Sequence, residues 1–193
     1  MTAEAPGFGL RADRSERPTR ASGIILALLM IASFALVLRQ IITVASGPLP
    51  PHPGVGVPSF VAKTPDGASI GLADYKGDVV LVDFWATWCP PCVAAMPSLE
   101  AIHEAYKDRR FTVLAVNQEA GDEEIVRSFA RRRSLSFPIA MDNGSIAHAF
   151  GVYSFPTSFL VGRDGLVRHT YYGPGDETQL RTDIEKALEE SKL

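Results

Sequence analysis

The sequence predicts an α/β fold, because strand-like and helix-like segments alternate along most of its 193 residues. Residues 79–86 and 111–117 are short, almost continuous apolar runs, which is typical of strands buried on both faces. A segment with helical character follows each of them. With 46% hydrophobic and 21% charged residues, the chain suits one globular domain with an appendage.

The appendage is an N-terminal apolar segment. Residues 21–38 carry no charge, and the apolar character resumes after Arg39 and Gln40. Because about 20 apolar residues span a bilayer and an arginine near one end can reach the headgroups, we expect a transmembrane anchor over residues 21–45.

Positive charge around this segment predicts its orientation. Four arginines lie within residues 1–20, whereas no Lys or Arg occurs between Arg39 and Lys63. This excess predicts a cytoplasmic tail over residues 1–20 and an extracytoplasmic remainder. A cleaved signal peptide is the alternative, since small residues at 45–47 could be cut.

Residues 46–57 are rich in proline and glycine and are expected to form a linker. Proline-rich chains extend by about 3.1 Å per residue, so this segment could hold the domain on the order of 35 Å from the bilayer. The folded domain is then expected over residues 58–193.

The first half of the domain is expected to contain a hairpin, a central strand, a long helix and a second buried strand. The turn Pro65-Asp66-Gly67 indicates the hairpin. Prolines suit the first turn of the helix, whereas Pro97 is expected to kink it. The expected ranges are 59–63 with 69–72, then 79–86, 90–107 and 111–117.

The second half is expected to add two helices, a short strand, a hairpin and a final helix. Asp122 is expected to cap a helix that places Ile125, Val126 and Phe129 on one face. Asp176 and Gln179 are typical of a capping box at the start of the last helix, which buries Leu180, Ile184 and Leu188. The remaining ranges are a strand at 137–140, a helix at 145–150 and a hairpin of 157–161 with 166–172.

The only two cysteines, Cys89 and Cys92, lie where the first buried strand gives way to a helix. Thiols at this spacing can close a small reversible disulfide, and the amides and dipole of a helix start favour the thiolate of the first cysteine. This pattern indicates redox chemistry, with Cys89 exposed and Cys92 shielded.

Other uses of the pair are a structural disulfide and copper binding. A structural disulfide normally closes a longer loop than this one. A zinc site needs two more ligands, and the four histidines, which could supply them, are scattered singly along the sequence. An outward-facing pair would be oxidised unless a partner reduced it.

Charge gives little indication of a polyanionic partner. The formal net charge is −3, and the triplet Arg131 to Arg133 lies at the end of an expected helix, where cations complement the helix dipole. We therefore expect no nucleic acid partner.

Several motifs together resemble a known family. LVDFWATWCPPC at 81–92 is similar to the active-site strand and turn of thioredoxin, with Pro97 five residues after Cys92. AVNQE at 115–119, FPIAMDNGSIAHAFGV at 137–152 and FPTSFLVGRDG at 155–165 extend the likeness. This assembly resembles the membrane-attached TlpA/ResA/CcmG-type thiol:disulfide oxidoreductases over residues 57–193.

The resemblance implies a thioredoxin fold with an N-terminal hairpin and a central insertion, in which Cys89 attacks and Cys92 resolves. It also implies that Asp83, a carboxyl group among large apolar neighbours, assists proton transfer at the resolving thiol. A cis-proline at Pro156 is implied, with Trp88, Phe155 and Thr157 forming the surface against which a substrate lies. Trp85 is expected to be part of the core.

Two residues depart from the pattern. Many of these reductants have a glutamate three residues after the second cysteine, where this chain has Ala95. Asp83 or Glu119 could substitute, and Glu119 follows the carboxyl end of a buried strand, where α/β proteins place their sites. Pro90 removes a backbone donor from the helix start.

The resemblance favours a reductant, although oxidants share the same motif. The substrates it implies are the haem-site disulfide of an apocytochrome c or a copper-site disulfide of an oxidase subunit, with a membrane thiol carrier as electron donor. It implies no cofactor and no bound metal. A Cu(I) chaperone using the same two thiolates is the alternative function, and a peroxidase fits less well because its cysteine needs no C-x-x-C partner.

Overall fold

The computed structural model describes residues 20–45 and 48–190, which form two separate compact units. The tail predicted over residues 1–20 lies outside the described part, apart from Arg20 at the start of a helix, and so do residues 46 and 47.

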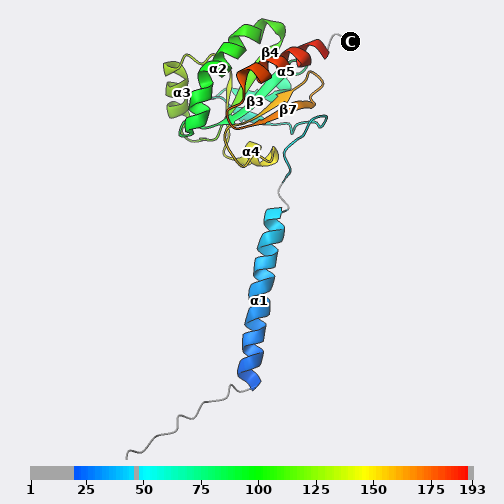
Figure 1. Cartoon of the computed structure of the whole chain (residues 1–193). Coiled ribbons are helices and arrows are strands. Elements are labelled where there is room, and N and C mark those ends of the chain that lie inside the picture. The colour runs from blue at the N-terminus through cyan, green and yellow to red at the C-terminus, as the bar shows by residue number, and fades with distance from the viewer. Residues whose placement is uncertain (1–19, 46–47, 191–193) are drawn as a thin grey trace, which may run out of the picture. The chain divides into compact units, whose positions relative to one another are not determined.

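The first unit is a single helix, α1, which runs over Arg20–Ala45 (Figure 1). Its segment Gly23–Gln40 has a mean hydropathy of 2.1 and is not covered by any other part of the described chain. At about 1.5 Å per residue, its 26 residues extend about 39 Å, more than the apolar thickness of a bilayer. Helix α1 is thus long and apolar enough for a membrane anchor, as the sequence predicted.

The second unit contains a mixed sheet of seven strands in the order β2-β1-β5-β4-β3-β6-β7. Strands β3, β4 and β5 are parallel, whereas β6 and β7 on one side and β1 and β2 on the other are antiparallel to their neighbours. Both central strands are buried along their whole length, as their apolar runs predicted. The strands are β1 Val61–Lys63, β2 Ser69–Gly71, β3 Val79–Trp85, β4 Phe111–Asn117, β5 Ile139–Met141, β6 Thr157–Val161 and β7 Val167–Tyr172.

Helices cover both faces of the sheet (Figure 1). Successive residues of β3 point to opposite faces, so Leu81 packs in the core under α2, α3 and α5, while Val82 packs in the core beside α4. Asp83 therefore shares the α2 face with Leu81. The helices are α2 Pro90–Tyr106, α3 Glu123–Arg132, α4 Ser145–Ala149 and α5 Glu177–Glu189, with 3-10 turns at Leu72–Tyr75 and Lys107–Arg109.

Helix α3 differs from the expectation at its first turn. Asp122 stands at the N-cap without a side-chain capping bond, and the carboxylate of Glu123 instead accepts the Gly121 N–H at 3.0 Å. Val126 and Phe129 are buried as expected, but Ile125 is 53% exposed. With only two buried apolar positions, the apolar face of α3 is narrower than predicted.

The start of α5 follows half of the predicted capping box. Asp176 accepts the backbone N–H groups of Thr178 and Gln179. The side-chain amide of Gln179 donates to Asp183 one turn further on, which draws it away from the N-cap. Leu180, Ile184 and Leu188 are buried, as predicted.

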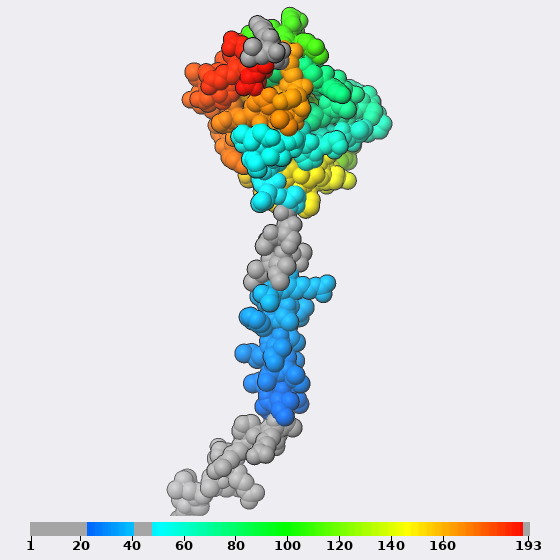
Figure 2. Space-filling view, turned by 90° about the vertical axis from the view of Figure 1, so that its right-hand side faces the viewer, coloured from blue at the N-terminus to red at the C-terminus, as the bar shows by residue number. Residues whose placement is uncertain are grey.

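The segment at residues 48–57, expected as an extended spacer, lies against the domain. The Gly54 N–H donates to the Val167 carbonyl, and the Val167 N–H donates to the Val55 carbonyl. The Val57 N–H donates to the Gly165 carbonyl. Figure 2 shows this N-terminal segment, in cyan, beside the orange surface of the last strands. Strand β7 is an edge of the sheet with free backbone groups, and pairing with them holds residues 54–57 on the domain.

Candidate functional site

Cys89 and Cys92 form a disulfide, with 2.04 Å between the sulfur atoms and 5.3 Å between the Cα atoms. Cys89 is the N-cap of α2, and the Cys92 N–H donates to its sulfur at 3.3 Å. Because Pro90 and Pro91 have no N–H, the amide of Cys92 is the first in this helix able to make such a contact. The structure thus presents the oxidised state of the predicted pair.

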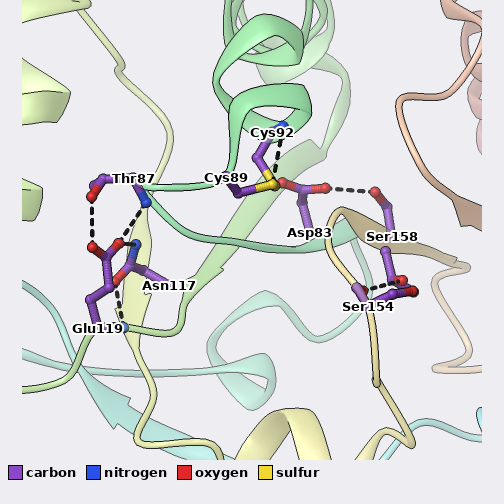
Figure 3. The surroundings of a disulfide bond; sticks show 9 residues. Asp83, Thr87, Cys89, Cys92, Asn117, Glu119, Ser154 and Ser158 are labelled. Atoms are coloured by element: carbon purple, nitrogen blue, oxygen red, sulfur yellow. Dashed lines mark hydrogen bonds between the residues drawn. A yellow bond between two sulfur atoms is a disulfide. The ribbon is translucent and has the colours of Figure 1, made fainter.

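The two cysteines differ less in exposure than expected. Cys89 is 4% exposed and Cys92 is 1% exposed, and both belong to the core under α2. The prediction of an exposed Cys89 is therefore wrong for the oxidised state. In this state the disulfide lies at the first turn of α2, where the Cys92 N–H contacts the Cys89 sulfur (Figure 3).

Asp83 lies in β3 on the α2 face and is 2% exposed. Its neighbour across the antiparallel β3–β6 pair is Ser158, whose hydroxyl donates to Oδ1 of Asp83 at 2.6 Å. Burial raises the pKa of Asp83 from 3.8 to about 6, and the hydrogen bond from Ser158 acts in the opposite direction. The burial inferred for this carboxyl group from its apolar neighbours in the sequence is therefore confirmed, and its hydrogen bond with Ser158 is drawn in Figure 3.

A cavity of about 300 Å³ connects Asp83 with the surface. Asp83 and Ser158 form part of its lining, as do the exposed residues Ala94 and Glu177. Water can therefore approach the buried carboxyl group. Ala95, at the position where similar reductants have glutamate, lines the same cavity.

Glu119 lies on the other side of the active-site loop (Figure 3). Its Oε2 accepts the Thr87 N–H at 2.6 Å and the side-chain amide of Asn117 at 2.9 Å, and its Oε1 accepts the Thr87 hydroxyl at 2.6 Å. The carboxylate is thus bound to the segment that precedes Cys89. Of the two carboxylates, Asp83 is the one that lines a cavity together with Ala95.

Aromatic side chains flank the pair. Trp88 is 64% exposed and packs edge-on against Phe155 with 6.1 Å between ring centroids, whereas Trp85 is fully buried. The Phe155–Pro156 peptide bond is cis, as the resemblance implied. Thr157 is buried and donates its hydroxyl to the carbonyl of Ser154, so its side chain supports this loop from inside.

Three polar residues of the site had not been identified from the sequence: Ser158, Thr87 and Asn117. Ser158 is found only through the β3–β6 register, which sets it opposite Asp83. Asn117 offered a signal, because it is a polar residue at the carboxyl end of an apolar buried strand. Within residues 20–45 and 48–190, no group of three or more His, Cys, Asp or Glu side chains is placed to hold a metal ion.

Comparison with known proteins places this site in a family. The Redoxin family model matches residues 52–188, which include the cysteine pair, Asp83 and Pro156. The chain belongs to the Redoxin family. Among curated proteins, this Redoxin-family chain is 35% identical over 134 residues to thiol-disulfide oxidoreductase ResA of Bacillus thuringiensis, covering 69% of this chain and 77% of that protein.

Solved structures agree with this assignment. A Chlorobium tepidum protein assigned as thiol:disulfide interchange protein DsbE matches with a TM-score of 0.67 and 34% identity, over 72% of this chain and 99% of the other. A secreted Mycobacterium tuberculosis disulfide oxidoreductase matches with a TM-score of 0.59 and 26% identity, over 66% and 95%. The predicted resemblance to TlpA/ResA/CcmG-type proteins is confirmed, and the protein is a thiol-disulfide oxidoreductase with a thioredoxin-like fold.

Proposed function

We propose that this Redoxin-family protein is a membrane-anchored, extracytoplasmic reductant of protein disulfides. The observation that carries the proposal is the cysteine pair at the start of α2, together with the buried Asp83 on the face of the sheet that α2 covers. Helix α1 supplies the anchor, and the charge asymmetry around it favours an outward-facing domain.

In the proposed reaction the reduced pair transfers two electrons to a substrate disulfide. The Cys89 thiolate attacks one substrate sulfur, the substrate disulfide breaks, and the released substrate thiolate takes up a proton. A mixed disulfide between Cys89 and the substrate results. The Cys92 N–H, which contacts the Cys89 sulfur at 3.3 Å in the oxidised state, supports a negative charge at that position.

The second step releases the substrate. Cys92 gives its proton to Asp83, and its thiolate attacks the Cys89 sulfur, which re-forms the Cys89–Cys92 disulfide and releases the second substrate thiolate. The released thiolate takes up a proton from water. With a pKa of about 6, Asp83 is mostly ionised near neutral pH and can accept that proton. The adjoining cavity lets water carry the proton away.

The proposed substrates are the haem-site disulfide of an apocytochrome c or the copper-site disulfide of an oxidase subunit. Exposed Trp88 and the partly buried Phe155, whose ring centroids lie 6.1 Å apart, offer an apolar surface for a protein chain, whereas the cis-Pro156 behind them is buried. Return to the reduced state needs electrons from a membrane thiol carrier, because a dithiol facing an oxidising compartment does not stay reduced alone.

Trapping of the mixed disulfide tests this proposal. In membranes, Cys92→Ser leaves an attacking thiol without a resolving one, so we expect covalent complexes on a non-reducing gel. Cys89→Ser is the matched control and is expected to give few or none. Partners with haem-binding or copper-binding cysteine pairs support the substrate assignment. Equal trapping by both variants contradicts the assigned roles.

Two further measurements address orientation and the alternative function. A reporter active only in the cytoplasm, fused after Leu193, is expected to be silent, and clear activity overturns the outward topology. The reduced chain is expected to reduce protein disulfides at a low redox potential without needing copper. Tight Cu(I) binding without disulfide reduction would favour the chaperone alternative.

A further inference from the structure

We infer that Glu119 is a positioning residue that holds the segment leading into Cys89 and carries no proton for the reaction. Its carboxylate, the side chain of Asn117 and residue Thr87 form a group that we call the Thr87 clamp. The inference rests on the proposed attack by Cys89, and it assigns to Thr87 and Asn117 a part in setting the geometry of that attack.

The carboxylate of Glu119 has three hydrogen bonds, all from groups that hold the loop or the adjoining strand. Oε2 receives the Thr87 N–H at 2.6 Å and the Asn117 amide at 2.9 Å, while Oε1 receives the Thr87 hydroxyl at 2.6 Å. An ionised carboxylate has only acceptor positions and satisfies all three donors at once. Hydrogen bonds to an ionised group are also shorter and stronger than neutral ones.

The clamp is fixed to the centre of the sheet. Asn117 is the last residue of β4, is fully buried, and pairs in register with Trp85 of β3. Its side-chain oxygen accepts the Glu119 N–H at 2.9 Å, and Gln118 donates its N–H to the carbonyl of Trp85 at 3.0 Å. The loop after β4 is thereby attached to the loop after β3 through both backbone and side chains.

The held segment leads directly into the reactive group. Thr87 is followed by Trp88 and Cys89, and the Cys89 N–H closes a turn on the carbonyl of Ala86 at 3.2 Å. Trp88 is 64% exposed, and its ring centroid lies 6.1 Å from that of Phe155. Without the clamp, the turn would lose its fixed point at Thr87, and both the Cys89 sulfur and the Trp88 ring would move more freely.

One substitution, Glu119→Gln, can distinguish a positioning role of Glu119 from a role in proton transfer. In Glu119→Gln, the amide oxygen can accept from the Thr87 N–H and from Asn117, the two donors now bound to Oε2. The amide nitrogen can donate to the Thr87 hydroxyl, which is able to accept once it rotates. Glutamine thus keeps all three contacts but cannot carry a proton at neutral pH.

The experiment compares Glu119→Gln, Glu119→Ala, Thr87→Val and Thr87→Ser in the full chain. Initial rates are measured with insulin and with a small aromatic disulfide, and the redox potential of the cysteine pair is measured alongside. Glu123→Ala is the matched control, since the Glu123 carboxylate also accepts a backbone N–H, that of Gly121, which lies outside the active-site loop. Circular dichroism checks that each variant folds.

We expect Glu119→Ala to lose up to about 100-fold in kcat/KM for insulin, because small displacements of a reacting group are costly. The loss is expected in kcat, through the displaced Cys89 sulfur, and in KM, through the Trp88 surface. It is expected to be smaller for the small disulfide, which does not need that surface. Glu119→Gln is expected to keep the wild-type rate, potential and pH profile. Thr87→Val removes one contact and is expected to fall between them, with Thr87→Ser restoring activity.

Two results overturn the inference. If Glu119→Gln loses as much activity as Glu119→Ala, Glu119 transfers a proton. If neither Glu119→Ala nor Thr87→Val changes the rates or the potential, the clamp does not position Cys89. Should Glu119→Ala fail to fold, the Thr87→Val and Thr87→Ser pair decides. Failure of the proposed function is separate, because it would appear as loss of covalent trapping in Cys92→Ser with the clamp intact.

Discussion

The two carboxylates that flank the active-site loop have opposite environments. Asp83 is almost completely buried, receives one side-chain hydrogen bond, and has its pKa raised to about 6. Glu119 is half-buried and receives three hydrogen bonds, two of them from Thr87. A carboxyl group kept short of donors is suited to exchanging a proton, while one saturated with donors is suited to holding a loop.

Replacing each carboxylate by its amide gives the largest expected contrast. Asp83→Asn is expected to slow resolution of the mixed disulfide by about 10² to 10⁴, the usual contribution of a general acid or base. Glu119→Gln is expected to leave this step unchanged. Rapid mixing of the reduced variant with a disulfide substrate, followed by acid quenching, measures it. Equal effects at both positions would remove the distinction between the two carboxylates.

Stability of the oxidised protein is the second contrast. The Asp83 carboxyl group has a pKa near 6 in the folded protein and an ordinary value of 3.8. Its contribution to the free energy of unfolding is therefore fully present below about pH 4 and is lost as the pH rises through 6. The difference corresponds to about 3 kcal/mol. We therefore expect oxidised Asp83→Asn to exceed the wild type in free energy of unfolding by up to this amount at pH 8.

Denaturant unfolding of the two oxidised proteins at pH 8 and at pH 3.5 checks this expectation. The advantage of the variant is expected to nearly vanish at the lower pH, where the Asp83 carboxyl group is neutral in the folded wild type and mostly neutral in the unfolded one. An advantage that is the same at both values would show that the effect arises from packing and not from ionisation.

The pH profile is expected to show a smaller effect. Because Asp83 accepts a proton only when ionised, the wild-type resolution rate is expected to fall about tenfold per pH unit below about 6. The profile of Asp83→Asn is expected to lack the break near pH 6, because Cys92 then loses its proton to solvent over the whole range, and that of Glu119→Gln is expected to retain it. Stopped-flow rates between pH 5 and pH 8 measure all three. A wild-type profile without the limb would contradict proton transfer by Asp83.

Ser158→Ala is expected to have the smallest effect. The Ser158 hydroxyl lowers the pKa of Asp83 against the stronger effect of burial. Removing it is therefore expected to move the midpoint of the pH profile upward while leaving the rate above pH 8 nearly unchanged. Ser158→Thr, which keeps a hydroxyl, is the matched control. A downward movement would show that the hydrogen bond favours the protonated acid.

The secondary structure was largely predictable because its signals are local. Continuous apolar runs gave β3 and β4, the Pro-Asp-Gly and Arg-Asp-Gly turns gave two hairpins, and the position of the cysteines gave the start of α2. The prediction was wrong where a local signal competed with another contact. Asp122 makes no capping bond, and Ile125 faces solvent.

The sequence by itself determined the chemistry of the site, because the spacing of Cys89 and Cys92 and the burial of Asp83 follow from residue types on one strand and one helix. Only the tertiary structure decided which groups surround them. Ser158 lies 75 residues from Asp83, and Thr87 lies 32 residues from Glu119. Sheet register and the meeting of two loops set these contacts, and no local pattern encodes them. The same holds for residues 48–57, whose composition predicts an extended chain but whose backbone pairs with the free edge of β7.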